Sequence, residues 1–146
     1  MAVFTVKGEA TLGILAGLRV RFHLGLNAAA HTAGQMLVRQ TQAGMESAGG
    51  GRLYPGSRRQ SSAPGGYPAV QTGQLKGSIQ YKVAASKLQF GSRGAFNKGF
   101  DYAIAQHEGT SRMAPRPYVT LTVQKSGSEI ANVLGKIVWA KMIGGG

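Results

Sequence analysis

Apolar residues recur at steps of three and four along the first third of the chain, which is the spacing of one helix face. Residues 9–46 are therefore predicted to form one long helix. Its apolar face consists of Leu15, Leu18, Phe22, Ala29, Ala33, Met36 and Leu37. Residues 18–26 also alternate between apolar and polar, which leaves a strand open there. Length and an alanine-rich continuation favour the helix, with a break near Gly17 and weak points at Gly25 and Gly34.

The segments on either side of this helix have a different character. Residues 1–8 are predicted to be an N-terminal arm or an edge strand, because positions 4–7 alternate apolar and polar. Residues 47–71 are rich in glycine, proline, serine and arginine, and bury too little apolar surface to offset the entropy of ordering. Long structureless stretches in small domains are usually functional or disordered. We expect this one to be an extended assembly loop that becomes ordered only against neighbouring subunits.

The middle of the chain changes to a period of two, which predicts strands. Thr72 is expected to cap a short turn that carries Leu75. Beyond Ser78 the alternation continues through a turn at residues 86–87, so an antiparallel hairpin is expected. Its apolar positions are Ile79, Tyr81, Val83, Ala85, Leu88 and Phe90. Residues 100–105 are predicted to be a third strand or a helical turn.

A second helix is predicted near the end of the chain. Its apolar stripe is Ile130, Val133, Leu134, Ile137, Val138 and Met142. A capping box of Ser126 and Glu129 would start this helix near residue 127, whereas the proline at position 117 suits a first helical turn. Alternation over residues 119–123 leaves a strand open there. We favour a helix from about residue 117 that is disturbed at Gly127.

These elements predict an α+β fold in a single domain of residues 1–146, with residues 143–146 as a flexible tail. The fold would contain a long N-terminal helix, a small antiparallel sheet, a C-terminal helix and a long loop rich in glycine, proline and serine. Hydrophobic residues make up 42% of the 146, which suits one core. The 23 glycines argue for long loops rather than an all-helical bundle.

The charge of the chain is strongly positive, with 17 basic and 5 acidic residues and a formal net charge of +12. No acidic residue lies between Glu46 and Asp101. The basic residues of that stretch are Arg52, Arg58, Arg59, Lys76, Lys82, Lys87, Arg93 and Lys98. Some of these lysines suit the solvent side of the predicted hairpin. Together the eight could also line a channel or contact phosphates, without reading bases.

Candidate chemistry is sparse. The chain has no cysteine, so disulfides and thiol chemistry are excluded, which fits a reducing cytoplasm or a particle assembled in one. The apolar run over residues 12–18 is too short to span a bilayer and is expected to be buried helix. No phosphate-binding glycine motif is present. Beside His107, Glu108 is expected to accept hydrogen bonds from the following turn or to pair with Arg112. We predict no enzyme, no metal and no cofactor.

Three blocks of residues follow one another in an order that is hard to obtain by chance. The first runs from Tyr54-Pro55-Gly56-Ser57 through residues 62–75 to Ser78-Ile79. The second is Tyr102-Ala103 with residues 107–110, and the third is residues 114–118, where two prolines stiffen the chain around Arg116. In this order and at these intervals, the blocks resemble the head-to-tail joining (neck, or tail completion) family of tailed bacteriophages. The resemblance covers approximately residues 4–142.

The resemblance implies a structural protein of the virion neck. Such a protein forms a ring that completes the tail and joins it to the DNA-filled head, with the genome passing through the lumen. It implies that the switch from loop to strand is set by Thr72, Gly73, Leu75, Ser78 and Ile79. Core and ring contacts would come from Tyr102, Glu108, Gly109, Thr110, Pro117 and Tyr118. The assembly motif further includes Tyr54, Pro55, Pro64, Gly65, Pro68 and Arg116. Two positions depart from the family pattern, since Gly66 and His107 stand where an acid and a hydrophobe are more usual.

The implied partners follow from this role. The chain would bind copies of itself in a closed head-to-tail ring, with six subunits favoured over twelve. It would also contact neighbouring connector or stopper, tail terminator or tail tube proteins, and double-stranded DNA weakly and without sequence specificity. No membrane is implied. Assembly would take place in the bacterial host cytoplasm, and the final location would be the head–tail junction of the virion.

Two functions of other classes stay open. One is a small basic protein that binds nucleic acids without sequence specificity, for which the net charge is the argument. The other is a hydrolase that uses His107 and Glu108, although no further catalytic group accompanies this pair.

Overall fold

A computed structural model describes residues 8–53, 55–56, 60–85 and 87–144, with only the backbone described over residues 8–13. Its longest element is helix α1, Gly8–Ser47. This helix runs without interruption, so the predicted break near Gly17 is wrong, and the strand alternative at residues 18–26 is excluded. Alanine and leucine in nearly every turn sustain the helix past its glycines. The prediction for residues 1–7 lies outside the described part.

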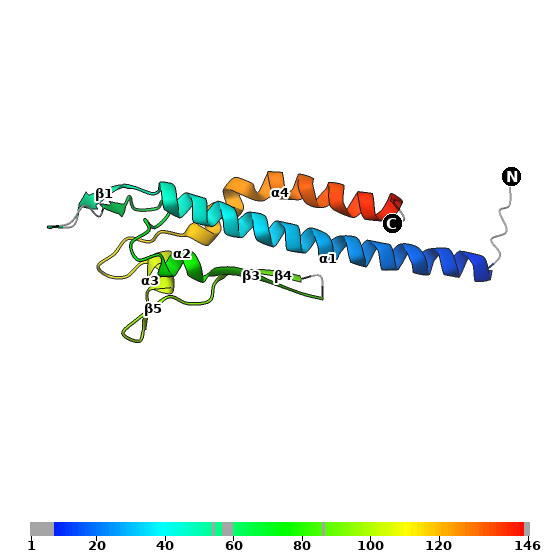
Figure 1. Ribbon diagram of the computed structural model, residues 1–146, viewed down its shortest axis with the longest axis horizontal. Helices are drawn as coiled ribbons and strands as arrows, with labels where there is room; N and C mark the ends of the chain where they lie inside the picture. Colours follow the sequence, from blue (N-terminus) through cyan, green and yellow to red (C-terminus); the bar gives the residue numbers. More distant parts are fainter. Residues whose placement is uncertain (1–7, 54, 57–59, 86, 145–146) are drawn as a thin grey trace.

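Helix α4, Tyr118–Ile143, lies antiparallel beside α1 (Figure 1). It excludes the strand alternative at residues 119–123 and passes through Gly127 without the predicted disturbance. Ser126 is buried inside the helix, so the capping-box start was wrong. The buried residues of α4 are spaced by four, which is one helix face: Tyr118, Thr122, Ser126 and Ile130. That face packs on α1.

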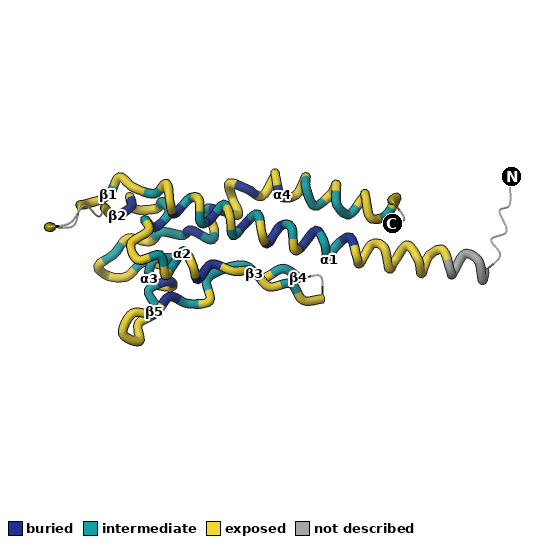
Figure 2. Tube along the Cα trace, in the orientation of Figure 1, coloured by how far each residue is buried: buried dark blue, intermediate teal, exposed yellow. Residues whose placement is uncertain are grey.

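The predicted hairpin is confirmed as β3, Ile79–Ala84, paired antiparallel with β4, Lys87–Ser92. Tyr81 lies opposite Phe90 on the half-buried side of the hairpin, which packs against α1. Figure 1 shows α1 between α4 and this hairpin, and Figure 2 shows the buried residues where the three layers meet. The core is therefore a thin seam along the C-terminal two-thirds of α1.

Three smaller pieces lie at the C-terminal end of α1. The loop predicted to be structureless contains a hairpin of its own, β1 (Gly50–Leu53) with β2 (Gln60–Ser62). The prediction was wrong because Gly51 lets the backbone of β2 approach closely, so these strands pair within one chain. A short helix α2, Gln74–Ser78, leads into β3. Gly73 occupies its N-cap position with a φ of 80°, so the predicted cap at Thr72 is displaced by one residue.

The third piece is a hairpin whose strands have two residues each, β5 (Phe96–Asn97) and β6 (Phe100–Asp101). It is followed by helix α3, Tyr102–Glu108. The predicted third strand therefore does not join the β3–β4 sheet, and most of residues 100–105 is helix. The carboxylate of Asp101 begins α3 by accepting a hydrogen bond from the N–H of Ala103, at 2.9 Å.

Two small clusters form the core. Ala33 and Leu37 of α1 pack on Ile130 of α4, and Met45 packs with Ile79 and Tyr118. Between them a buried hydroxyl chain joins the helices. Its oxygens are Oγ1 of Thr41, Oγ1 of Thr122 and the hydroxyl of Tyr67, with links of 2.9 and 3.0 Å. No helix in the described part of the chain is both long and apolar enough to cross a membrane.

Candidate interaction surface

The three sequence blocks meet at the end of the molecule where α1 stops. Arg116 links them: its guanidinium donates to Oγ and to the carbonyl of Ser62, at 2.6 and 2.8 Å. Its backbone N–H donates to the carbonyl of Gln106 in α3, at 2.7 Å, and the N–H of Gly65 donates to the carbonyl of Pro115 at 3.0 Å. The third block therefore holds the first block and α3 together within one chain.

The residues expected to set the loop-to-strand switch lie at the junction of α2 and β3, where half-buried hydrogen bonds hold the backbone. The hydroxyl of Ser78 donates to the carbonyl of Leu75 at 2.7 Å and lies 2.6 Å from Oγ of Ser92. Ile79 is buried, and Leu75 packs against the cluster around Tyr118. The side chain of Thr72 is exposed. These positions form the fold rather than a surface for partners.

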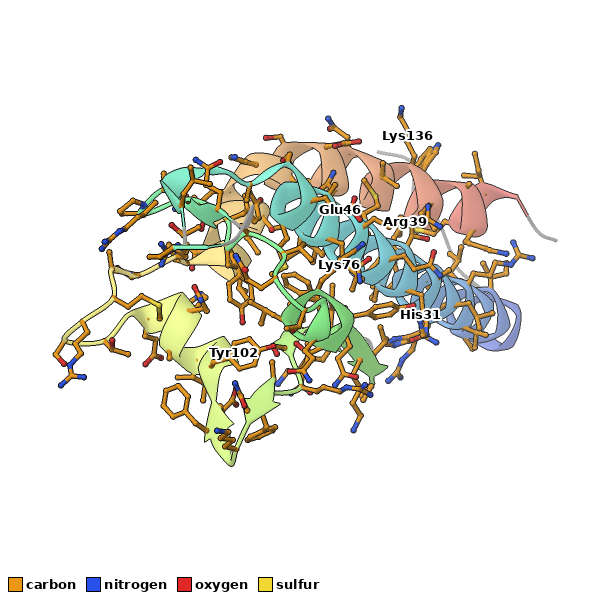
Figure 3. The ribbon with its side chains drawn as sticks, turned by 60° about the vertical axis from the view of Figure 1, so that its left-hand side comes forward. His31, Arg39, Glu46, Lys76, Tyr102 and Lys136 are labelled. Atoms are coloured by element: carbon orange, nitrogen blue, oxygen red, sulfur yellow. The ribbon has the colours of Figure 1, made fainter. Side chains whose placement is uncertain are left out.

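The second block also has a structural role. Gly109 has a φ of 81°, and a Cβ there would lie 2.9 Å from the carbonyl oxygen of Met113, so glycine fits the turn. The N–H of Thr110 donates to the same carbonyl at 2.8 Å. The hydroxyl of Tyr102 donates to Oε1 of Gln74 at 3.3 Å, and Figure 3 shows Tyr102 beside α2. Pro117 takes the N-cap position of α4.

The remaining members of the motif are divided between core and surface. Pro68 is buried, whereas Pro55 and Pro64 are exposed, and Tyr54 lies outside the described residues. Glu108 is exposed, and neither of its predicted contacts, with the following turn or with Arg112, occurs in the described part of the chain. This carboxylate is therefore available to a partner.

The Tyr118 side chain is the polar group most deeply placed among these blocks. It is 2% exposed, its hydroxyl donates to the carbonyl of Ala103 at 3.3 Å, and the ring of His107 meets it edge-on at 5.3 Å. Burial raises the pKa of Tyr118 above its ordinary value of 10.0, and the nearby charge of Asp101 adds to the effect.

This shift predicts a pH-dependent stability. The contribution of the neutral phenol is fully present below pH 10.0 and is lost as the pH rises through the raised folded-state pKa, because the unfolded chain ionises first. Tyr118→Phe should cost about 1 kcal/mol at pH 8 through the lost hydrogen bond. The difference in free energy of unfolding between Tyr118→Phe and the unmodified chain should narrow above pH 10. Urea unfolding across this range measures it, and a constant gap would contradict the assignment.

The basic residues do not gather at one place. Arg52 is in β1, Lys98 is in the β5–β6 turn, and Arg93 follows β4. Lys82 and Lys87 lie on the exposed side of the hairpin, as the solvent-side interpretation predicted. Lys76 forms an ion pair with Glu46 of α1 (Figure 3). Arg58 and Arg59 lie outside the described residues. The six described members of this set therefore form no phosphate cradle within the chain.

His107 and Glu108, the two residues considered for catalysis, lie in different environments. The ring of His107 packs against Tyr118, and its Nε2 is buried without a hydrogen-bond partner among the described residues. Glu108 points to solvent, and no hydrogen bond between the two occurs in the described part of the chain. The described residues also include no group of three or more side chains that could hold a metal ion.

Sequence reasoning missed two exposed apolar surfaces. The first, here named the arm, is residues 14–24 of α1. Predicted as part of a buried face, it instead has every side chain exposed, and its N-terminal part extends beyond the end of α4 (Figures 1 and 2). Its large apolar side chains are 39–65% exposed: Ile14, Leu15, Leu18, Val20, Phe22 and Leu24.

The second surface, here named the α3 patch, consists of Phe96, Phe100 and Ile104, which are 57–60% exposed. The two phenylalanines flank a turn at Lys98 and Gly99, whose φ values are 50° and 81°. Glycine at the second position of a two-residue turn favours a hairpin, and this signal, with a phenylalanine near each side, could have identified this surface. The arm and the α3 patch lie toward opposite ends of the molecule (Figure 1).

Comparisons of the chain with protein-family models, with curated proteins and with solved structures found no match.

Proposed function

We propose that this protein is a structural subunit of the neck of a tailed bacteriophage, which assembles as a closed ring and joins the tail to the DNA-filled head. Three lines of support converge: the ordered sequence blocks, the positive charge, and the exposed apolar surface. The blocks support the family, and the fold has the expected order of a long helix, small antiparallel sheets and a closing helix. The exposed surface supports the assembly.

The arm is the observation that carries the proposal. Burying a large apolar side chain contributes about 1.5–3 kcal/mol. Six such side chains are 39–65% exposed on the arm, and burying their remaining surface would contribute about 5–10 kcal/mol, comparable to the whole stability of a small domain. Apolar surface on that scale marks a site of protein association. The chain is therefore a subunit of something larger.

A ring is the assembly that best suits two apolar surfaces at opposite ends. When different surfaces of identical subunits meet head to tail, the contact repeats, and it either closes into a ring or continues as a filament. A junction through which DNA passes requires the ring. Six subunits are favoured over twelve. Neighbouring connector, terminator or tail-tube proteins would cover the faces above and below.

The net charge of +12 fits the same role. Exposed lysines and arginines spread over one subunit become rings of positive charge when the subunit is repeated. Such rings attract passing DNA or the acidic rims of adjacent rings without holding a particular sequence. Weak contact of this kind suits a conduit.

The direct test is joining in vitro. Filled heads and completed tails from a phage that encodes this chain, but lacks the intact gene, should remain separate. Adding the purified protein should join them and restore infectivity, and cryo-electron microscopy should show its density at the junction. Particles that join and infect equally well without the chain would overturn the proposal.

The net charge also favours a second candidate, a protein that binds nucleic acids by itself without sequence specificity. This function predicts tight binding of duplex DNA at low salt, lost steeply as salt rises, by a purified chain that does not assemble. A gel-shift titration across salt concentrations separates the two functions, because a neck subunit should bind DNA only feebly. The six basic residues described between Glu46 and Asp101 are dispersed over the chain, which weighs against this candidate.

A further inference from the structure

The arm has apolar residues on more than one side. At 3.6 residues per turn, Leu15, Leu18 and Phe22 fall on one side of the helix, and Val20 and Leu24 fall on another. Arg19 and Arg21 border the first of these groups, one along each edge. A helix that is apolar on several sides requires burial between partners. The arm is therefore expected to be inserted rather than laid on a flat surface.

The first of these groups continues the line along which α1 packs on α4. From Phe22 the line proceeds in steps of three and four through Gly25, Ala29 and Ala33. Gly25 lies where α4 comes nearest, since a Cβ there would be 3.2 Å from Cα of Val138. α4 continues past Val138 only as far as Ile143, and Phe22, Leu18 and Leu15 of the same line are 39–55% exposed. Because α4 covers the rest of this line, we expect a segment of another protein chain to cover its exposed part.

A receiving site with matching features lies beside α3. A hollow of about 410 Å³ is lined by Ala103, Ile104, Tyr118 and Val119, with Glu108 also in its lining. Ile104 lies on α3 between two carboxylates, because Asp101 begins the helix and Glu108 ends it. His107 also lines the hollow, and its buried Nε2 has no partner in the described part of the chain.

We propose that the arm of one copy docks into the hollow beside α3 of the next copy. Leu18 and Phe22 would cover the α3 patch, Ile104 first, while Arg19 and Arg21 would approach Glu108 and Asp101. The charge pattern points to a second copy of this chain, because an apolar stripe edged by arginines meets an apolar residue flanked by carboxylates. This inference deepens the ring proposed above and rests on it.

A lipid surface is a poorer occupant of the arm. A helix that lies in a membrane interface has one apolar face and a polar face opposite, whereas the arm has apolar side chains on both sides of its arginines. Nucleic acid would engage the arginines but leave the leucines and Phe22 in water. Only a protein site with both apolar and acidic groups satisfies the whole arm.

Cysteine cross-linking tests the contact, since the chain has no cysteine of its own. Leu18→Cys combined with Ile104→Cys should give, on mild oxidation of the purified chain, a ladder of covalent multimers that ends at one closed species. Leu18→Cys with Gln124→Cys is the matched control, because Gln124 is exposed on α4 and does not line the hollow. An equal ladder from the control pair, or dimers from Leu18→Cys alone as the main product, would overturn the proposal.

A charge exchange tests the partner surfaces independently. Glu108→Arg and the double variant Arg19→Glu, Arg21→Glu should each weaken assembly about tenfold or more, and combining them should restore it. These side chains are exposed, so circular dichroism should confirm an unchanged fold for each variant. Failure of the combined variant to recover would refute the pairing of these surfaces.

Flotation with vesicles of anionic and zwitterionic phospholipid examines the lipid alternative. Binding that needs Leu18 and Phe22, in a protein that forms no ladder, would assign the arm to a membrane and reject the proposal. The outcome for the neck function is separate. A ladder from the purified chain together with failed head–tail joining would support the contact between copies and reject the phage role.

Discussion

Replacing Gly34 with alanine is expected to lower the free energy of unfolding by about 2 kcal/mol, although alanine is the better helix former. A Cβ at this position would overlap the ring of Tyr81, whose Cε2 would be only 2.8 Å away. The ring lies between α1 and the hairpin, and edge-on to His31 at 5.8 Å. Relieving this overlap requires the Tyr81 ring, or the strand β3 that carries it, to move away from α1.

The control is another helical glycine that has free space around it. Gly127 is exposed in α4, with no atom within 4 Å of a Cβ built there. Gly127→Ala should therefore raise the free energy of unfolding, by up to about 1 kcal/mol. Urea denaturation followed by circular dichroism measures both variants.

A double-mutant cycle shows whether the ring is the cause. Tyr81→Ala by itself removes packing, but it also removes the obstacle, so Gly34→Ala should cost little in that background. If Gly34→Ala is as stable as the parent chain, or costs the same with and without the Tyr81 ring, the close packing of hairpin on helix is wrong.

Changing Leu18 and Phe22 together to alanine is expected to abolish assembly while leaving each subunit folded. Truncating a central apolar anchor of an interface typically costs about 2 kcal/mol or more, and 2 kcal/mol corresponds to about a 30-fold loss of affinity. Both side chains lie on the arm, 39% and 41% exposed, and neither belongs to the two core clusters. The subunit should therefore lose little stability.

Sedimentation velocity over a range of concentrations measures this effect. The parent chain should appear as a discrete multimer of its 15.3 kDa subunit, and the double variant as a monomer. Val123→Ala is the matched control, because Val123 is an exposed apolar residue of α4 outside the arm. Assembly of the double variant at the parent's concentration, or loss of assembly in the control, would show that the arm is not the contact.

These two experiments address different parts of the same helix, the packed middle of α1 and the exposed arm. Over residues 25–45 the small side chains of α1 let α4 and the hairpin approach closely, so changes there alter the fold. Over the arm every side chain is exposed and none belongs to the core clusters, so changes there should alter association. A single periodic pattern thus serves intramolecular packing in one part and, on our proposal, intermolecular packing in the other.

The elements with a strong local period could be predicted from the sequence. Long helices at both ends and the hairpin from Ile79 to Ser92 follow from periods of 3.6 and 2, which each segment carries by itself. The choice of helix over strand at residues 18–26 and 119–123 was also correct, because the flanking residues extend the helical pattern well beyond the short alternation. Glycine inside a helix lowers local propensity but did not break either helix here.

What the tertiary structure decided is where these elements find partners. Nothing local distinguishes Leu18, which is exposed, from Leu37, which is buried, because their difference depends on where α4 ends along α1. The joining of the three blocks through Arg116 likewise requires chain segments more than fifty residues apart to meet, and the strand pairing within residues 47–71 depends on a close approach at Gly51. Periodicity specifies which face of a helix is apolar, whereas only the lengths and packing of its neighbours determine how much of that face is covered.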